Sequence, residues 1–156
     1  MRMINLIVIH CSATRENTDY SPERLESDHK ARGFLRAGYN FYIRKSGEIV
    51  DLRPLEQIPA HVRGYNKHSI GICYEGGLDA SGQAQDTRTE AQKTSLIRLI
   101  QHLLTRFPDS RVCGHRDLSE DLNGDGVISP DEWSKQCPSF DAIPEYKELA
   151  YGQRKR

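Results

Sequence analysis

The sequence has few cysteines, no long apolar run and no excess of charge of one sign. Its four cysteines are too sparse among 156 residues for a disulfide framework, so we expect them to be buried thiols or metal ligands. The 22 basic and 22 acidic side chains cancel, which leaves no global field to attract nucleic acid or an anionic membrane. Neither is therefore an expected partner.

The only apolar run near the N-terminus, INLIVIH, is far too short to span a bilayer. It ends in His10 rather than in a small-residue cleavage site, so we expect no signal peptide in this chain and no membrane insertion. The run is typical of a strand buried on both faces of a sheet. The only concentrated basic run, at 153–156, is short and terminal, and we expect a solvated tail there.

Helix signals alternate with strand signals along a length typical of a single domain. Helices are expected from the Ser21 cap to Gly33, from a capping box at Thr89 to Pro108, and near the end over 141–152. Strands are expected at 4–10, in a hairpin over 39–54, at 68–77 and at 111–115. The pattern predicts an α/β fold, with a mixed central sheet flanked by helices and an active-site crevice at the strand ends.

Three potential metal ligands, His10, His115 and Cys137, lie at strand ends or in adjacent loops. Two imidazoles and a thiolate suit zinc, and three protein ligands leave a fourth position for water, as in catalytic sites. The alternative is a strand-end histidine bonded to backbone and a buried cysteine that acts as a small hydrophobe. The residues alone leave both open.

Five segments occur in the order seen in a known family: VIHCSAT, AGYNFYIRKSGEI, HVRGYNKHSIGICYEGG, GHRDLS and KQCPSFD. From about Ile4 to Asp141 the chain resembles the zinc-dependent N-acetylmuramoyl-L-alanine amidases of the phage-lysozyme and peptidoglycan-recognition type (type 2 amidases). The resemblance implies cleavage of the amide between N-acetylmuramic acid and the L-alanine of the stem peptide in bacterial peptidoglycan. It also implies zinc as the cofactor.

The resemblance carries roles to individual residues. His10, His115 and Cys137 fall on the three zinc-ligand positions of the family. Tyr39 falls on the tyrosine that assists at the reacting carbonyl, and Lys135 on the basic residue that stabilises the oxyanion. Because catalytic members need the cysteine ligand and many binding-only members have lost it, Cys137 favours an active enzyme.

Four further residues have two interpretations each. Glu75, near the end of a predicted strand, is either a general base or a carboxylate facing solvent. His61 matches a loop that lines the substrate groove in the family, and it is either a substrate contact or a surface histidine. Asn66, in the same loop, is expected to hold a turn. Trp133 either stacks on sugar or belongs to the core.

An acidic insertion at about 119–133 lies between the family segments GHRDLS and KQCPSFD. Shorter members of the family have far fewer residues between these two segments. Its sequence DLNGDGVISPDE matches an EF-hand calcium loop with Gly126 at the sixth position. The ligands would be Asp121, Asn123, Asp125, the Val127 carbonyl, Ser129 through water, and Glu132. The alternative is an acidic turn whose side chains cap their own backbone without metal.

We therefore predict a zinc-dependent peptidoglycan amidase formed by one catalytic domain over 1–156, with calcium as a possible second ion. A non-catalytic peptidoglycan-binding module is the alternative, which the intact ligand set argues against. A calcium-regulated protein is less favoured, because only one calcium loop is present. We expect a monomer that is made in the cytoplasm and acts on the cell wall, as a phage-type lysin or after export by another route.

Overall fold

The computed structural model describes the backbone of residues 1–154 and the side chains of residues 1–149. The basic run expected to be a solvated tail, at 153–156, lies outside the described side chains. Within the described part of the chain, no helix combines the length and the apolar character needed to cross a bilayer.

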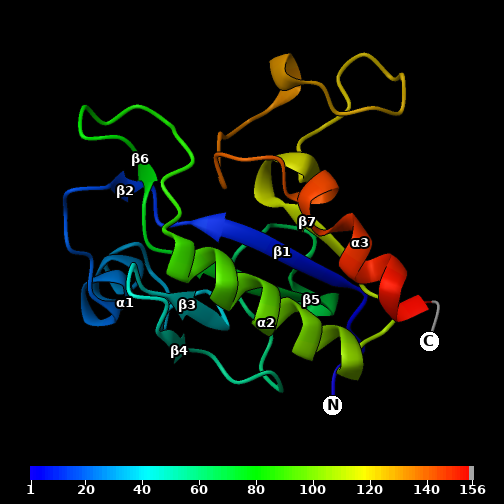
Figure 1. Cartoon of the computed structure of the whole chain (residues 1–156), viewed down its shortest axis with the longest axis horizontal. Helices are drawn as coiled ribbons and strands as arrows, with labels where there is room; N and C mark the ends of the chain where they lie inside the picture. Colours follow the sequence, from blue (N-terminus) through cyan, green and yellow to red (C-terminus); the bar gives the residue numbers. More distant parts are fainter. Residues whose placement is uncertain (155–156) are drawn as a thin grey trace.

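A five-stranded mixed sheet forms the centre of the molecule, with strand order β4-β3-β5-β1-β7 (Figure 1). Parallel pairs join β1 to β5 and β7, and β5 to β3, whereas β4 runs antiparallel to β3. The strands are β1 (Leu6–Cys11), β3 (Phe41–Ile43), β4 (Ile49–Asp51), β5 (Ser69–Tyr74) and β7 (Arg111–Gly114). The predicted fold class is confirmed.

A second, two-stranded parallel sheet pairs β2 (Thr14–Arg15) with β6 (Gly77–Leu78). The sequence did not predict it, because two residues are too few to show an alternating pattern. The predicted hairpin over 39–54 is present, but its strands β3 and β4 are only three residues each.

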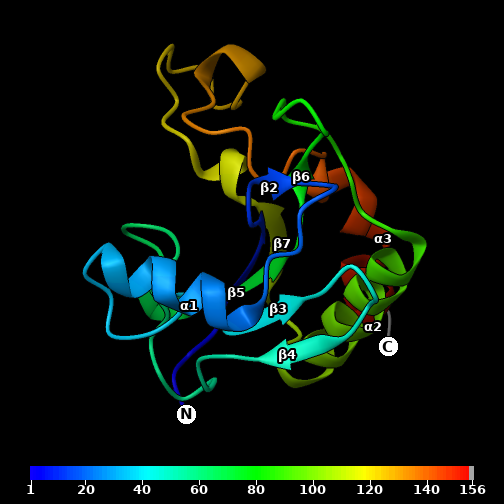
Figure 2. The same ribbon diagram turned by 90° about the vertical axis from the view of Figure 1, so that its left-hand side faces the viewer.

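Three α-helices cover the sheet, with α1 on one face and α2 and α3 on the other (Figure 2). They are α1 (Pro22–Ala31), α2 (Glu90–Arg106) and α3 (Ala142–Arg154). Ser21 caps α1 by accepting a hydrogen bond from the Arg24 amide, and Thr89 and Gln92 form the predicted capping box of α2. Three short 3₁₀ turns lie in the connections: η1 (Asn66–His68), η2 (His115–Leu118) and η3 (Pro130–Glu132).

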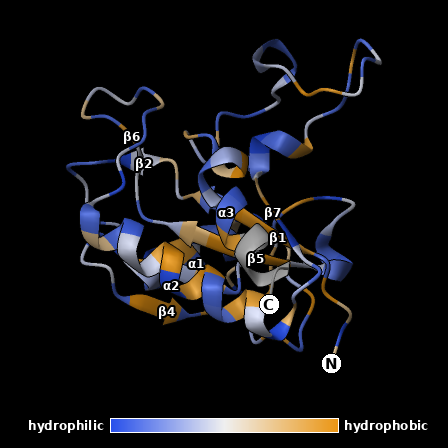
Figure 3. Ribbon diagram, turned by 45° about the vertical axis from the view of Figure 1, so that its right-hand side comes forward, coloured by the Kyte–Doolittle hydropathy of each residue, from blue (hydrophilic) through white to orange (hydrophobic). Residues whose placement is uncertain are grey.

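The strand β1 lies between β5 and β7 and is buried along its whole length, and its side chains alternate between the two layers. Ile7 and Ile9 pack with α2 residues such as Leu96, whereas Leu6 and Val8 belong to a separate cluster on the other face. The strands of the sheet are mainly hydrophobic and the outlying loops mainly hydrophilic (Figure 3). This burial accounts for the continuous apolar run that the sequence shows.

The parallel strands β1, β5 and β7 end at the same edge of the sheet. His10 lies one residue before the end of β1, and His115 follows directly after β7. The insertion, at about 119–133, projects from this edge as the long yellow and orange loop of Figure 1. Its only described helical part is the short η3, so the insertion lacks the flanking helices of an EF-hand pair.

Candidate metal centre

The three predicted zinc ligands, His10, His115 and Cys137, come together at this edge. Each offers one ligand atom, and these atoms all lie within 4.8 Å of one another. The His10 Nδ1 atom is 3.8 Å from the Cys137 sulfur, and the two imidazole centroids are 4.7 Å apart. His10 is buried, whereas His115 and Cys137 are half-buried, so the group is open on one side. Two imidazoles, a thiolate and an open side fit a catalytic zinc site.

The electrostatics of the centre also suit a cation. Burial, and then the neighbouring His61 and His115 side chains, lower the pKa of His10 well below its ordinary value. Burial and the charge of Lys135 lower the pKa of His115 to about 4. Both rings are thus neutral near pH 7, the form that binds metal. Contact with the Cys11 thiol, followed by burial, raises the pKa of Cys137, and a bound cation would favour its thiolate form.

Hydrogen bonds from three elements hold the cysteine segment in place. The Cys11 amide donates to the Cys137 sulfur at 3.2 Å, and the Arg116 amide donates to the Cys137 carbonyl at 2.8 Å. The buried Tyr74 hydroxyl donates to the Pro138 carbonyl at 2.6 Å. The position of this ligand is therefore set by β1, β5 and η2 together, despite the insertion that precedes it.

His61 does not lie free on the surface. Its Nδ1 atom is 2.7 Å from His10 Nε2, and its Nε2 atom is 2.7 Å from the Ser69 hydroxyl. Burial, followed by the charge of His115, lowers the pKa of His61 to about 3, so the ring is neutral. With both ring nitrogens engaged by the protein, only ring carbons remain for the predicted substrate contact. Asn66 holds the turn as predicted, because its side-chain oxygen accepts from the His61 and Val62 amides.

A crevice of about 660 Å³ opens beside the centre, and it is lined by Cys137, His115 and both predicted catalytic residues, Tyr39 and Lys135. The Tyr39 ring lies 4.9 Å from the His10 ring, centroid to centroid. Burial raises the pKa of Tyr39 well above its usual value, so its hydroxyl stays protonated and can donate a hydrogen bond. The Lys135 side chain is exposed.

The charged side chains that line the crevice are all cationic: Arg32, Arg63 and Lys135. Among the described residues that line it, none carries a carboxylate. The chain as a whole has no net charge, so this clustering is local. The crevice is therefore complementary to an anionic ligand.

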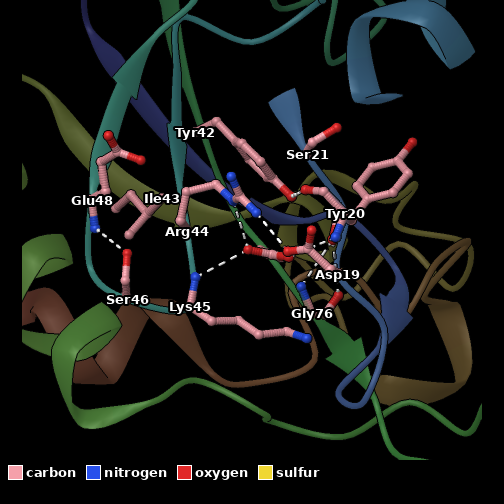
Figure 4. A network of polar contacts seen from close by, with 12 residues as sticks. Asp19, Tyr20, Ser21, Tyr42, Ile43, Arg44, Lys45, Ser46, Glu48 and Gly76 are labelled. Carbon is pink, nitrogen blue, oxygen red and sulfur yellow. Dashed lines mark hydrogen bonds and ion pairs between the residues drawn. The ribbon is translucent and has the colours of Figure 1, made fainter. Parts of the chain in front are cut away.

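Glu75 is a structural carboxylate, and the expectation that it faces solvent is wrong. It is 1% exposed and accepts hydrogen bonds from the Arg44 guanidinium at 2.9 Å and from the Tyr20 and Lys45 amides at 2.7 and 3.1 Å. Figure 4 labels the three donors, of which Tyr20 lies just before α1 and Arg44 and Lys45 follow β3. Burial alone would raise the pKa of Glu75, but the bonds from Arg44 and the two amides outweigh it, and the pKa is lowered. Glu75 does not line the crevice, so it is not placed to serve as a general base.

Trp133 also has a structural role that the sequence did not indicate. The Arg116 guanidinium lies 3.7 Å above its ring, and the same guanidinium pairs with Asp141 at 2.6 Å. Trp133 does not line the crevice. Trp133 therefore attaches the end of the insertion to η2. This contact with Arg116 replaces the two interpretations from the sequence, stacking on sugar and a place in the main core.

In the acidic insertion, Asp121, Asp125 and Glu132 bring carboxylate oxygens within 4.8 Å of one another. The Asp121 carboxylate accepts from the Gly126 amide at 2.7 Å, and Glu132 accepts from the Ser129 amide at 3.0 Å. Gly126 has a φ of +82°, the left-handed conformation that the sixth position of a calcium loop needs. The same bonds are those of an acidic turn that caps itself, so the geometry is compatible with both predictions.

Comparisons with known proteins agree on one family. The family profile described as N-acetylmuramoyl-L-alanine amidase matches residues 1–139. The endolysin of Enterobacteria phage K11 is 33% identical over 133 residues, which cover 85% of this chain and 79% of that protein. The N-acetylmuramoyl-L-alanine amidase LysC from Clostridium intestinale URNW superposes with a TM-score of 0.70 at 27% identity, over 97% of this chain and 85% of that one. Drosophila PGRP-LB shares the fold, with a TM-score of 0.69 at 21% identity over 94% of this chain and 81% of that one.

Proposed function

The chain belongs to the N-acetylmuramoyl-L-alanine amidase family, whose profile covers residues 1–139, and on that basis we propose that it is a zinc-dependent peptidoglycan hydrolase. The bond cleaved is the amide between N-acetylmuramic acid and the L-alanine of the stem peptide. The observation that carries the proposal is the convergence of His10, His115 and Cys137 at an open crevice. We propose that 1–156 forms one catalytic domain, with the insertion as an addition to the rim of its active site.

The residues at the centre divide the chemical work. When bound by His10, His115 and Cys137, zinc would polarise the amide carbonyl and lower the pKa of a water to about 7. The Tyr39 hydroxyl assists at the carbonyl, because Tyr39 lines the crevice and its ring lies 4.9 Å from the His10 ring. The Lys135 ammonium stabilises the charge that develops on the carbonyl oxygen.

The charge of the crevice supports an acidic substrate. Stem peptides carry free carboxylates, and the charged residues that line the crevice are Arg32, Arg63 and Lys135. Such complementarity favours specificity and rapid association more than it raises affinity. We propose that these cations orient the peptide side of the substrate, while His61 contributes only the carbon edge of its ring to the wall.

Digestion of purified sacculi tests the reaction. An amidase releases new L-alanine amino termini and no new reducing ends, whereas a glycosidase does the reverse. The non-catalytic alternative predicts binding to sacculi with neither product. If neither product appears, the zinc content of the same preparation shows whether the protein lacked its metal or is inactive with zinc bound.

We also propose that the acidic insertion binds calcium through Asp121, Asn123, Asp125, the Val127 carbonyl and Glu132, with Ser129 acting through water. The support is the full EF-hand pattern together with the close approach of the three carboxylates. A bound ion would order the segment that leads to Lys135 and Cys137. Calcium would then act on catalysis through local order.

We propose, finally, a monomer that is made in the cytoplasm and acts on the bacterial cell wall. The support for this place of action is that relatives of the chain are endolysins of phages. Fractionation of producing cells, with activity measured on sacculi, tests this location.

A further inference from the structure

We propose that His61 is a positioning residue of the metal centre, which fixes the tautomer and the ring orientation of His10. The proposal builds on the zinc dependence argued above and assigns His61 a role other than substrate contact. His61 lies 51 residues from His10 in the sequence, yet the two rings meet at 2.7 Å. Through this contact the ring of His10 would be held for the metal.

With zinc bound at His10, the hydrogen bonds have one direction. His10 Nδ1 lies 3.8 Å from the Cys137 sulfur, so Nδ1 is the atom that would bind the zinc, and it then carries no proton. The proton of the neutral His10 ring is then on Nε2, which donates to His61 Nδ1 at 2.7 Å. His61 must accept at Nδ1, so its own proton is on Nε2 and is donated to the Ser69 hydroxyl at 2.7 Å. The chain runs from His10 through His61 to Ser69.

The surrounding backbone is built to hold the His61 ring. The Asn66 side-chain oxygen accepts from the His61 and Val62 amides, each at 2.9 Å, which fixes the start of the loop. On β5, a Cβ added to Gly71 would lie 2.9 Å from the His61 ring. Gly71 lies in a regular strand, so the close approach of the imidazole explains the glycine, and a need for unusual backbone angles does not. The receiving Ser69 is fully buried.

A neutral imidazole in this position has a consequence for the metal. Metal-bound histidines usually donate their second N–H to a carboxylate, a backbone carbonyl or water. In this protein the partner is an uncharged ring, which orients His10 without adding negative charge. A centre of two neutral imidazoles, one thiolate and a divalent zinc ion therefore stays formally cationic, and this favours polarisation of a carbonyl.

Two variants of His61 separate its hydrogen bond from its bulk. His61→Phe keeps a planar ring and removes both nitrogens, whereas His61→Asn keeps an oxygen near the place of Nδ1 that can accept from His10. Zinc affinity is measured by competition with a chromogenic chelator. We expect His61→Phe to weaken zinc binding by roughly 10- to 100-fold, the usual effect of losing such a partner, and His61→Asn to restore most of it. Melting temperatures of the zinc-free proteins control for folding.

The tautomer itself is measured by ¹⁵N NMR on the zinc-free wild type, where His10 should carry its proton on Nε2. Wild-type zinc affinity in His61→Phe, equal weakening by Phe and Asn, or a proton on His10 Nδ1 would each overturn the proposal. If His61→Phe does not fold, Ser69→Ala tests the far end of the hydrogen-bonded chain, with weaker zinc binding as the expected result and unchanged binding as the contrary one. A wild type that binds no zinc would overturn the zinc dependence itself, and the tautomer measurement would still decide the His10–His61 arrangement.

Discussion

His10, His115 and Cys137 come from three different parts of the chain and meet within 4.8 Å, and we propose that together they hold the zinc. We expect His10→Ala, His115→Ala and Cys137→Ser each to reduce bound zinc and nearly to abolish hydrolysis of sacculi, because two remaining ligands hold the ion weakly. Metal analysis of the purified variants and release of L-alanine amino termini are the two measurements. The exposed helix residue His102 provides the matched control, and His102→Ala should change neither. Full activity in any of the three ligand variants would contradict the site.

Lys135 and Tyr39 should affect the rate and leave the metal in place. Both line the crevice beside the ligands, where a donor can reach the oxygen on which charge develops. Lys135→Ala is expected to keep its zinc and to lower kcat by roughly 10²- to 10³-fold, the usual effect of losing one such donor. Tyr39→Phe, which removes only the hydroxyl, should behave similarly. Full kcat in Lys135→Ala would exclude its proposed role.

At the scale of single residues, the sequence predicted what neighbouring residues indicate and missed contacts between distant segments. The convergence of His10, His115 and Cys137 could be predicted because each lies in a short, recognisable segment. The pairing of His61 with His10 could not, because it depends on the register that brings Gly71 of β5 beside the His61 ring. The ion pair of Glu75 was missed for the same reason, since its partner Arg44 lies 31 residues away on another segment.

At the scale of elements, the inserted loop at about 119–133 is the part of the chain for which we propose a second metal ion, calcium. Calcium should raise the melting temperature of the zinc-loaded protein, and by mass action a hundredfold excess over Kd adds about 2.7 kcal/mol to the free energy of unfolding. Asp125→Ala should remove this shift. Asp131→Asn is the matched control, because Asp131 is an exposed acid of the same loop outside the group of three carboxylates. Zinc has to stay bound, so calcium is withdrawn with a calcium-selective chelator, and the absence of any shift at millimolar calcium would leave the loop as a turn.

Helix ends were well predicted, whereas the two-residue strands β2 and β6 were not. Ser21 and Thr89 mark helix starts through side-chain bonds to amides three residues on, a signal that is local to the sequence. The two-residue strands β2 and β6 form only because β1 and β5 run parallel and carry their continuations side by side. Such elements depend on the tertiary fold, so no local sequence pattern predicts them.

At the scale of the whole molecule, parallel strands gather chemistry at one edge. β1 delivers His10 and β7 delivers His115 to the same side, and β5 provides Tyr74, which anchors the segment of the third ligand. Helices cover both faces of the sheet, α1 on one and α2 and α3 on the other, so the crevice lies at the ends of the strands. The arrangement agrees with the general rule that open α/β sheets bind ligands at the carboxyl ends of their strands.

Burial of several histidines at that edge should also make the stability of the zinc-free protein depend on pH. The pKa is lowered to about 3 for His61 and to about 4 for His115, by burial first in both cases, from an ordinary value of 6.5. Between about pH 4 and 6.5 the unfolded chain binds more protons than the folded one, so the free energy of unfolding should fall as the pH falls through this window. Above pH 6.5 the contribution is complete. Urea unfolding of the zinc-free protein at several pH values measures the slope. His115→Ala should make it shallower and His102→Ala should leave it unchanged, and an equal slope in wild type and His115→Ala would show that the buried ring does not drive the dependence.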